Sequence, residues 1–138
     1  MSFLLDTNIV SELRRGEAAN QNVVAWFDQQ PVNALFLSVI TVGEIRQGIE
    51  QLRSKRSAQA APLDRWLDAL VEFYEDRLLY VDGAVADEWG RLQARRPGHA
   101  IDGLLAATAL VYKLTVVTRN VRDFSGLPVR VLNPFMLS

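Results

Sequence analysis

The sequence contains no cysteine and a single histidine among its 138 residues. The lack of cysteine excludes a disulfide framework, a thiolate zinc site and a cysteine nucleophile, and one imidazole cannot build a multi-histidine metal centre. The histidine, His99, follows Pro97-Gly98 and is expected in an exposed loop. The formal net charge of −1 argues against a protein that coats nucleic acid with a general basic surface. A nucleic-acid enzyme with local charge is consistent with it.

Long hydrophobic runs and targeting signals are also absent. The N-terminal residues carry no basic region, and the longest apolar run, Leu104 to Tyr112, is far too short to cross a bilayer. We therefore expect a soluble, cytoplasmic protein with no membrane association. The phosphate-binding motifs G-x-x-x-x-G-K-[ST] and G-x-G-x-x-G and the G-x-S-x-G elbow do not occur, so common nucleotide-binding and serine-hydrolase chemistry finds no support.

The composition and the pattern of apolar residues predict one α/β domain over residues 1–138. Hydrophobic residues make up 49% and charged residues 22% of the chain, as in ordinary globular domains of this length. Short apolar runs predict strands over 3–5, 35–40, 78–81, 115–118 and 129–132. Segments with helical periodicity predict helices over 7–15, 22–30, 41–53, 58–76, 84–96 and 102–113. Strands that alternate with helices indicate a largely parallel sheet.

Four acidic residues are predicted to meet at one edge of this sheet, since ligands of parallel α/β sheets bind beyond the carboxyl ends of the strands. Asp6 ends the first strand, Glu44 lies one turn into the helix after the second, and Asp123 follows the strand 115–118. Asp102 begins a helix that reaches that strand through a very short turn. Helix and strand must then be antiparallel, which brings Asp102 to the same edge.

Such a cluster predicts a cation site. Neighbouring carboxylates repel one another unless a cation neutralises them. Ligands that are all oxygen favour hard ions such as Mg²⁺ or Mn²⁺ over zinc. These ions, held by few carboxylates together with substrate phosphate, are typical of phosphoryl transfer and phosphodiester hydrolysis.

Each acid taken alone also fits a purely structural role. Asp6 would cap the helix that follows it, and Thr41 with Glu44 matches a capping box in which Glu44 bonds back to the Thr41 amide. Asp102 would be an N-cap or a first-turn acid favoured by the helix dipole. Asp123 would close a turn. The argument for a site therefore depends on the four acids together.

Four motifs occur in a fixed order along the chain, and through them the chain resembles a known family. They are LLDTNIVSE (residues 4–12), SVITVGEIRQGI (38–49), IDGLLAATA (101–109) and VVTRNVRDF (116–124). The chain resembles PIN-domain ribonucleases and, within them, the VapC-type toxins of bacterial toxin–antitoxin pairs, including the FitB-like branch. The resemblance implies a five-stranded, mainly parallel sheet flanked by helices and RNA cleavage that depends on Mg²⁺ or Mn²⁺.

The resemblance also assigns roles to residues. Catalytic and metal-binding roles carry over to Asp6, Glu44 and Asp102. For the fourth acid, family members use either the position of Asn120 or that of Asp123, and only Asp123 is charged here. Asn8 and Thr118 match polar residues that support the site in the family. Apart from the resemblance, we expect Asn120 to bond a backbone group in the turn or to orient Asp6 or a metal-bound water. Arg119 and Arg122 flank the site, where they would either bind RNA phosphates or be solvated loop residues.

The partners implied are a VapB/FitA-type antitoxin, an RNA substrate, DNA only through the antitoxin, and a second copy of the chain in a homodimer. Amphipathic helices near the N-terminus suggest an apolar groove for a partner helix. The residues in question are Ile9, Val10 and Leu13 and, in the next helix, Val42, Ile45 and Ile49. The alternative is a catalytically weak PIN subunit that acts mainly as half of a DNA-binding regulatory complex. The intact set of acids disfavours this alternative.

Overall fold

The structure is a computed structural model that describes residues 1–137. Its centre is a five-stranded sheet with the strand order β3-β2-β1-β4-β5, in which every neighbouring pair is parallel. The strands are β1 (Phe3–Leu5), β2 (Leu35–Ser38), β3 (Leu78–Leu79), β4 (Thr115–Val117) and β5 (Val131–Leu132). The predicted α/β fold with a parallel sheet is confirmed.

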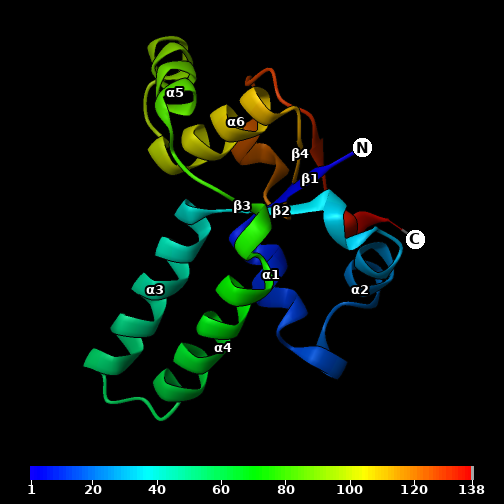
Figure 1. Ribbon diagram of the computed structural model, residues 1–138, viewed down its shortest axis with the longest axis vertical. Coiled ribbons are helices and arrows are strands. Elements are labelled where there is room, and N and C mark those ends of the chain that lie inside the picture. Colours follow the sequence, from blue (N-terminus) through cyan, green and yellow to red (C-terminus); the bar gives the residue numbers. More distant parts are fainter. Residues whose placement is uncertain (138) are drawn as a thin grey trace.

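Six α-helices flank the sheet (Figure 1). They are α1 (Thr7–Leu13), α2 (Gln21–Asp28), α3 (Val39–Ser54), α4 (Ala60–Phe73), α5 (Gly83–Arg95) and α6 (Ala100–Tyr112). Short 3₁₀ helices lie between them: η1 (Gly16–Ala18), η2 (Val32–Ala34), η3 (Glu75–Arg77), η4 (Val121–Phe124) and η5 (Pro134–Met136). Within residues 1–137, no helix is both long and apolar enough to cross a membrane.

The two faces of the sheet bury two separate apolar cores. Phe3 and Leu5 of β1 point to the face covered by helices α1 to α4, whereas Leu4 between them points to the face covered by α5 and α6. Successive side chains of a strand face opposite ways, so this alternation places one helical layer on each side. Figure 1 shows α5 and α6 on one side of the strands and α1, α3 and α4 on the other. Both faces of the central strand β1 are therefore covered by helices and buried.

The predicted strand 35–40 ends earlier than expected, at Ser38. The Ser38 hydroxyl accepts a hydrogen bond from the Ile40 amide at 3.0 Å and thereby caps α3, which begins at Val39. Thr41 therefore lies inside the helix, fully buried, and its hydroxyl has no hydrogen-bond partner among the described residues. The predicted capping box between Thr41 and Glu44 is therefore wrong, and the Glu44 side chain is free to make another contact.

The ends of β1 and β4 bring the first and the last motif together. Leu5 is paired with Val117, and the Asp6 amide donates to the Val117 carbonyl at 2.9 Å. The next residue of each strand, Asp6 or Thr118, is thus the first beyond the sheet at the same carboxyl edge. This register positions the site.

Candidate active site

Asp6 lies at the junction of β1 and α1, where it is only 7% exposed. It is the N-cap of α1, and its Oδ1 accepts from the Thr7 amide at 2.8 Å. Its Oδ2 accepts from the Thr118 hydroxyl at 2.8 Å and from the Asn8 amide group at 3.3 Å. The capping role and the place at the sheet edge are both confirmed. One lone pair of Oδ1 has no donor among these contacts and remains available to a ligand.

Burial makes the Asp6 carboxylate costly to ionise. Desolvation raises the pKa of Asp6 above the ordinary carboxyl value of 3.8, against the hydrogen bonds from Thr118, Thr7 and Asn8, and the negative charge of Asp123 raises it further. A buried carboxylate in this state gains from a nearby cation, because the cation favours the charged form.

A small network of polar side chains fixes the orientation of Asp6. Asn8 donates from Nδ2 to the Thr118 hydroxyl at 3.2 Å as well as to Asp6, and its Oδ1 accepts from the Arg119 amide at 3.0 Å. The Thr118 hydroxyl also accepts from the Asn120 amide at 3.0 Å. The Asn120 side chain is exposed and makes no hydrogen bond within residues 1–137. Support for Asp6 thus comes from Asn8 and Thr118.

Glu44 reaches the site from α3 and is held there by Thr7. The Thr7 hydroxyl donates to Glu44 Oε1 at 2.6 Å, which joins two residues 37 positions apart. Oε2 of Glu44 accepts no hydrogen bond from the described residues. Sequence reasoning missed Thr7, although its place directly after Asp6 at the start of α1 was a usable signal.

Asp102 lies in the first turn of α6, with its side chain 24% exposed. Its carboxylate accepts no hydrogen bond within residues 1–137, and His99 Nδ1 lies 3.8 Å from Oδ2. His99 precedes α6 with a positive φ of 51° and an exposed side chain. The expected exposure of His99 and the first-turn position of Asp102 are both confirmed.

The pKa of Asp102 is raised above the ordinary carboxyl value of 3.8. Burial is the largest cause, followed by the negative charges of Asp123 and Asp6. His99 lowers this pKa, and the charge of Glu44 raises it by a smaller amount. The other three predicted acids, Asp6, Glu44 and Asp123, therefore all act on the Asp102 carboxylate.

Asp123 is carried by η4, directly after the loop that follows β4. Its side chain is half-buried and makes no hydrogen bond within the described part of the chain, so it does not close the turn. The neighbouring Phe124 is 2% exposed and anchors the segment in the core. The Asp123 carbonyl accepts from Arg96 Nη2 at 2.9 Å, a contact that sequence reasoning also missed.

The two predicted phosphate-binding arginines lie at the same edge but differ in their surroundings. Arg119 stacks its guanidinium on the Phe135 ring, with 4.7 Å from Cζ to the ring centroid. Arg122 is exposed, and neither arginine forms an ion pair with an acid of residues 1–137. Both line an open polar pocket together with Asn120 and Asp123.

The donor set suits a hard dication that keeps most of its water. Within residues 1–137, no three His, Asp or Glu side chains are placed closely enough to hold an ion by themselves. Mg²⁺ is commonly held by one or two carboxylates, with water and substrate oxygens as its other ligands. Asp6 retains a free lone pair and Asp102 has no hydrogen-bond donor. These two carboxylates therefore fit such an ion.

Comparison with known proteins agrees along the whole chain. Residues 3–128 match the PIN domain. The chain is 34% identical to Toxin FitB of Neisseria gonorrhoeae over 96% of this chain and 98% of that protein. It is 31% identical to VapC ribonuclease Y4jK of Sinorhizobium fredii over 96% of this chain and 97% of that protein.

Solved structures agree with the sequence comparison. A structure of FitAB bound to an IR36 DNA fragment superposes with a TM-score of 0.85, at 32% identity, over 99% of this chain and 97% of that chain. The crystal structure of FitAcB from Neisseria gonorrhoeae gives 0.84 at 33% identity, over 98% and 99% of the two chains.

Proposed function

Because this chain belongs to the PIN domain family, in its VapC-type branch, we propose that it is a toxin endoribonuclease. It hydrolyses RNA phosphodiester bonds with the help of Mg²⁺ or Mn²⁺ and is neutralised by a cognate antitoxin. The observation that carries this proposal is the state of Asp102. Its carboxylate is partly buried and accepts no hydrogen bond from the described residues, and burial and the charges of three further acids raise its pKa. A cation and its waters would satisfy all of these groups at once.

Asp6 and Asp102 would hold the ion directly, while Glu44 and Asp123 would hold its waters or a second ion. The bound ion would lower the pKa of an attacking water and neutralise the charge that develops on the phosphate. The protein's own contribution is orientation. Thr118 and Asn8 favour the ionised form of Asp6 and fix the orientation of its carboxylate, because they donate hydrogen bonds to it.

Arg119 and Arg122 would bind RNA phosphates beside the acids. Neither guanidinium is neutralised by an acid within residues 1–137, and both border the polar pocket at the sheet edge. An arginine can donate two parallel hydrogen bonds to a phosphate. Of the two, Arg122 is the freer to do so, since Arg119 is stacked on Phe135.

The proposed reaction is tested with the purified chain, free of any partner, and a set of structured and unstructured RNAs. Cleavage is expected with Mg²⁺ or Mn²⁺ and not with EDTA, and Asp6→Asn should abolish it while circular dichroism remains that of the wild type. Contamination by a host nuclease is the main hazard, so Asp6→Asn purified in parallel is the matched control. Equal cleavage by the wild type and Asp6→Asn would refute the assignment.

The antitoxin would bind a smaller apolar surface than the sequence suggests. Ile9, Val10, Ile45 and Ile49 are buried, so most of the two predicted faces pack the core of the protein itself. What remains open is a groove of about 190 Å³ between α1, α2 and α4. Its apolar lining includes Val10, Leu13, Phe27, Trp66 and Leu70. An amphipathic helix of the antitoxin would fit this groove by burying apolar side chains in it.

The second candidate function is a regulatory subunit that acts with its antitoxin on DNA. The similarity to the FitAB complex bound to a DNA fragment favours testing it. If this were the main role, the complex with the antitoxin would bind operator DNA, but the free chain would cleave no RNA at any Mn²⁺ concentration. Gel-shift and cleavage assays on the same preparation separate the two roles, and light scattering of the free chain tests the proposed homodimer.

A further inference from the structure

Helix α5 carries none of the four acids, yet it contacts both segments that carry Asp102 and Asp123. Trp89, in the middle of α5, lies beside the start of α6, and Arg96, the C-cap of α5, lies beside η4. We infer that Arg96, at the end of α5, is a positioning residue that holds Asp123 next to Asp102. This inference rests on the proposed function, because the acids matter only if they bind a cation.

The contact to η4 is a side-chain hydrogen bond across 27 residues. Arg96 Nη2 donates to the Asp123 carbonyl at 2.9 Å. No other side chain of residues 1–137 donates to the backbone of Val121–Phe124. The next residue, Phe124, is anchored in the core. The Asp123 backbone is therefore held by the Arg96 side chain, by its own amide, which donates to the Asn120 carbonyl at 3.0 Å, and by the burial of Phe124.

The contact to α6 is equally close and fixes the other acid. Trp89 Nε1 donates to the Ala100 carbonyl at 3.2 Å. A Cβ atom placed on Gly103 would lie 3.0 Å from Gln93 Nε2 and 3.3 Å from two Trp89 ring atoms. Only glycine lets α6 approach α5 this closely without a shift of those side chains. The turn that bears Asp102 is thus packed directly against α5.

Together these contacts make α5 a common support for two acids that are 21 positions apart in the sequence. The Asp102 carboxylate feels the charge of Asp123 more strongly than that of Asp6 or Glu44, which agrees with this shared support. If Arg96 released the Asp123 carbonyl, η4 would keep its anchor at Phe124 and its own backbone hydrogen bond to Asn120 but lose its tie to the end of α5. The proposed direct ligands, Asp6 and Asp102, would then stay in place, whereas Asp123 would no longer be held beside them.

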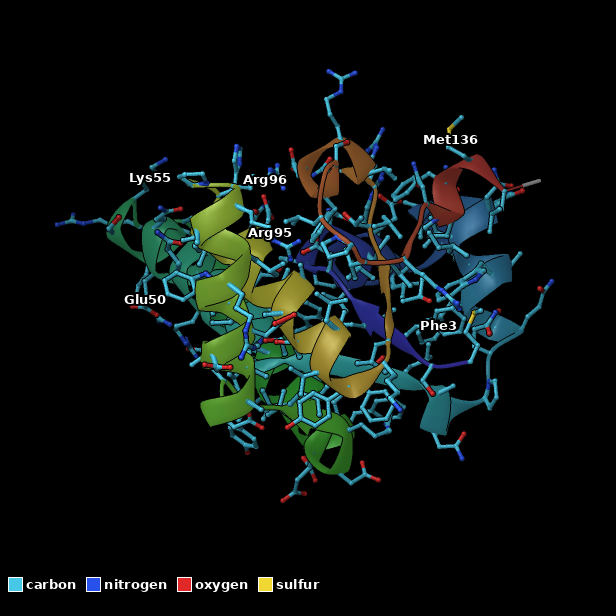
Figure 2. All side chains as sticks on the ribbon, turned by 90° about the horizontal axis from the view of Figure 1, so that it is seen from above. Phe3, Glu50, Lys55, Arg95, Arg96 and Met136 are labelled. Atoms are coloured by element: carbon cyan, nitrogen blue, oxygen red, sulfur yellow. The ribbon has the colours of Figure 1, made fainter. Side chains whose placement is uncertain are left out.

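The neighbouring Arg95 supplies a matched control. Figure 2 shows Arg95 and Arg96 at the same end of α5. Both are arginines near the helix C-terminus, where positive charge favours the helix dipole. Arg95 is exposed and makes no hydrogen bond or ion pair with another described residue. A loss caused only by removing charge from the helix end would therefore appear in both alanine variants.

The experiment measures Mn²⁺ affinity by calorimetry, without RNA, for the wild type, Arg95→Ala, Arg96→Ala and Arg96→Lys. Arg96→Ala should weaken Mn²⁺ binding by about tenfold, as is common when a group behind a ligand is removed. Arg95→Ala should change the Mn²⁺ affinity by less than about twofold. Arg96→Lys should retain most of the wild-type affinity that Arg96→Ala loses, because a lysine can still donate to a carbonyl. Arg96→Gln, which cannot span the same distance, replaces Arg96→Ala if the latter does not fold.

A double-mutant cycle tests whether Arg96 acts through Asp123. In an Asp123→Asn background, Arg96→Ala should weaken Mn²⁺ binding by less than about twofold, since the shared effect is already lost. Wild-type affinity in Arg96→Ala, or an undiminished tenfold effect in the Asp123→Asn background, would overturn the role of Arg96. Equal Mn²⁺ binding by the wild type and Asp6→Asn would instead overturn the proposed metal site, so the two claims fail separately.

Discussion

The Thr7 hydroxyl donates a hydrogen bond of 2.6 Å to Glu44, and this contact joins the start of α1 to the second turn of α3. The residue that follows the buried Asp6 thus orients a second acid of the same site. The bond occupies Oε1 of Glu44 and leaves Oε2 without a donor from residues 1–137. One side chain therefore sets which oxygen of Glu44 is available to a ligand.

Replacement of Thr7 by valine keeps the shape of the side chain and removes this donor. We expect Thr7→Val to lower RNA cleavage by about tenfold at limiting Mg²⁺, because the Glu44 carboxylate is no longer oriented. The free energy of unfolding should fall by about 1 kcal/mol, the usual worth of one hydrogen bond. Rates across a Mg²⁺ titration and urea unfolding measure the two effects.

Thr7→Ser is the control for this prediction, since it retains the hydroxyl. It should cleave RNA within about twofold of the wild type, as its donor to Glu44 is preserved. If Thr7→Val and Thr7→Ser behaved alike, the hydrogen bond to Glu44 would have no part in the reaction.

The raised pKa values of Asp6 and Asp102 predict how stability depends on pH without metal. Because both lie above the ordinary value of 3.8, the folded state binds these protons more tightly than the unfolded state. Their contribution to the free energy of unfolding is therefore fully present below 3.8 and is lost as the pH rises through the raised values. In EDTA, this part of the stability should decline from acidic to neutral pH.

Asp102→Asn should remove part of this decline while it removes activity. At neutral pH in EDTA the variant should melt at a higher temperature than the wild type, and the difference should shrink toward about pH 4. Cleavage should fall by at least about 100-fold, since a metal ion contributes several kcal/mol to the transition state. Thermal melts over this range, with and without Mn²⁺, measure it. A variant less stable than the wild type at every pH would contradict the expected repulsion.

The general architecture was predictable because it follows from local patterns. The alternation of apolar runs with helical periodicity gives the parallel α/β sheet, and the position of Asp6 directly after the first run places it at the carboxyl edge. The convergence of Asp102 with Asp6 followed from one short turn between α6 and β4. These arguments need only the direction of each element.

Other features of the fold and the site were not predicted from the sequence. Val39 and Ile40 have side chains that favour strands, so the predicted strand ran past Ser38, but the cap from Ser38 to the Ile40 amide starts the helix there. The bonds from Thr7 to Glu44 and from Arg96 to the Asp123 carbonyl span 37 and 27 residues. Such contacts depend on how the helices pack and not on the spacing of residues along any one of them.

The groove between α1, α2 and α4 gives a prediction for the partner. Leu13→Asp and Leu70→Asp would each place a charge in the apolar lining and should weaken antitoxin binding by at least about tenfold, as a charge buried without a partner is costly. Cleavage by the free chain should be unchanged, so each variant would be more toxic than the wild type when expressed with its antitoxin. Full inhibition of both variants would place the antitoxin elsewhere.

The last prediction decides between the two residues that follow β4. Asp123 is half-buried and charged and acts on both Asp6 and Asp102, whereas Asn120 is exposed and its side chain bonds to no described residue. A neutral amide is also a weak ligand for a hard dication. We therefore expect Asp123→Asn to lower cleavage by about 10- to 100-fold and to raise the Mg²⁺ requirement, because ligands that act through water contribute on this scale.

Asn120→Ala is the comparison for this prediction. Its cleavage rate should stay within about threefold of the wild-type rate, because the side-chain amide of Asn120 makes no hydrogen bond with a described residue. Single-turnover rates over a Mg²⁺ titration measure both variants under identical conditions. Restoration of the Asp123→Asn rate at high Mg²⁺ would indicate that Asp123 contributes affinity for the ion more than chemistry. A full-rate Asp123→Asn enzyme with unchanged Mg²⁺ dependence would reduce the site to the three carboxylates of Asp6, Glu44 and Asp102.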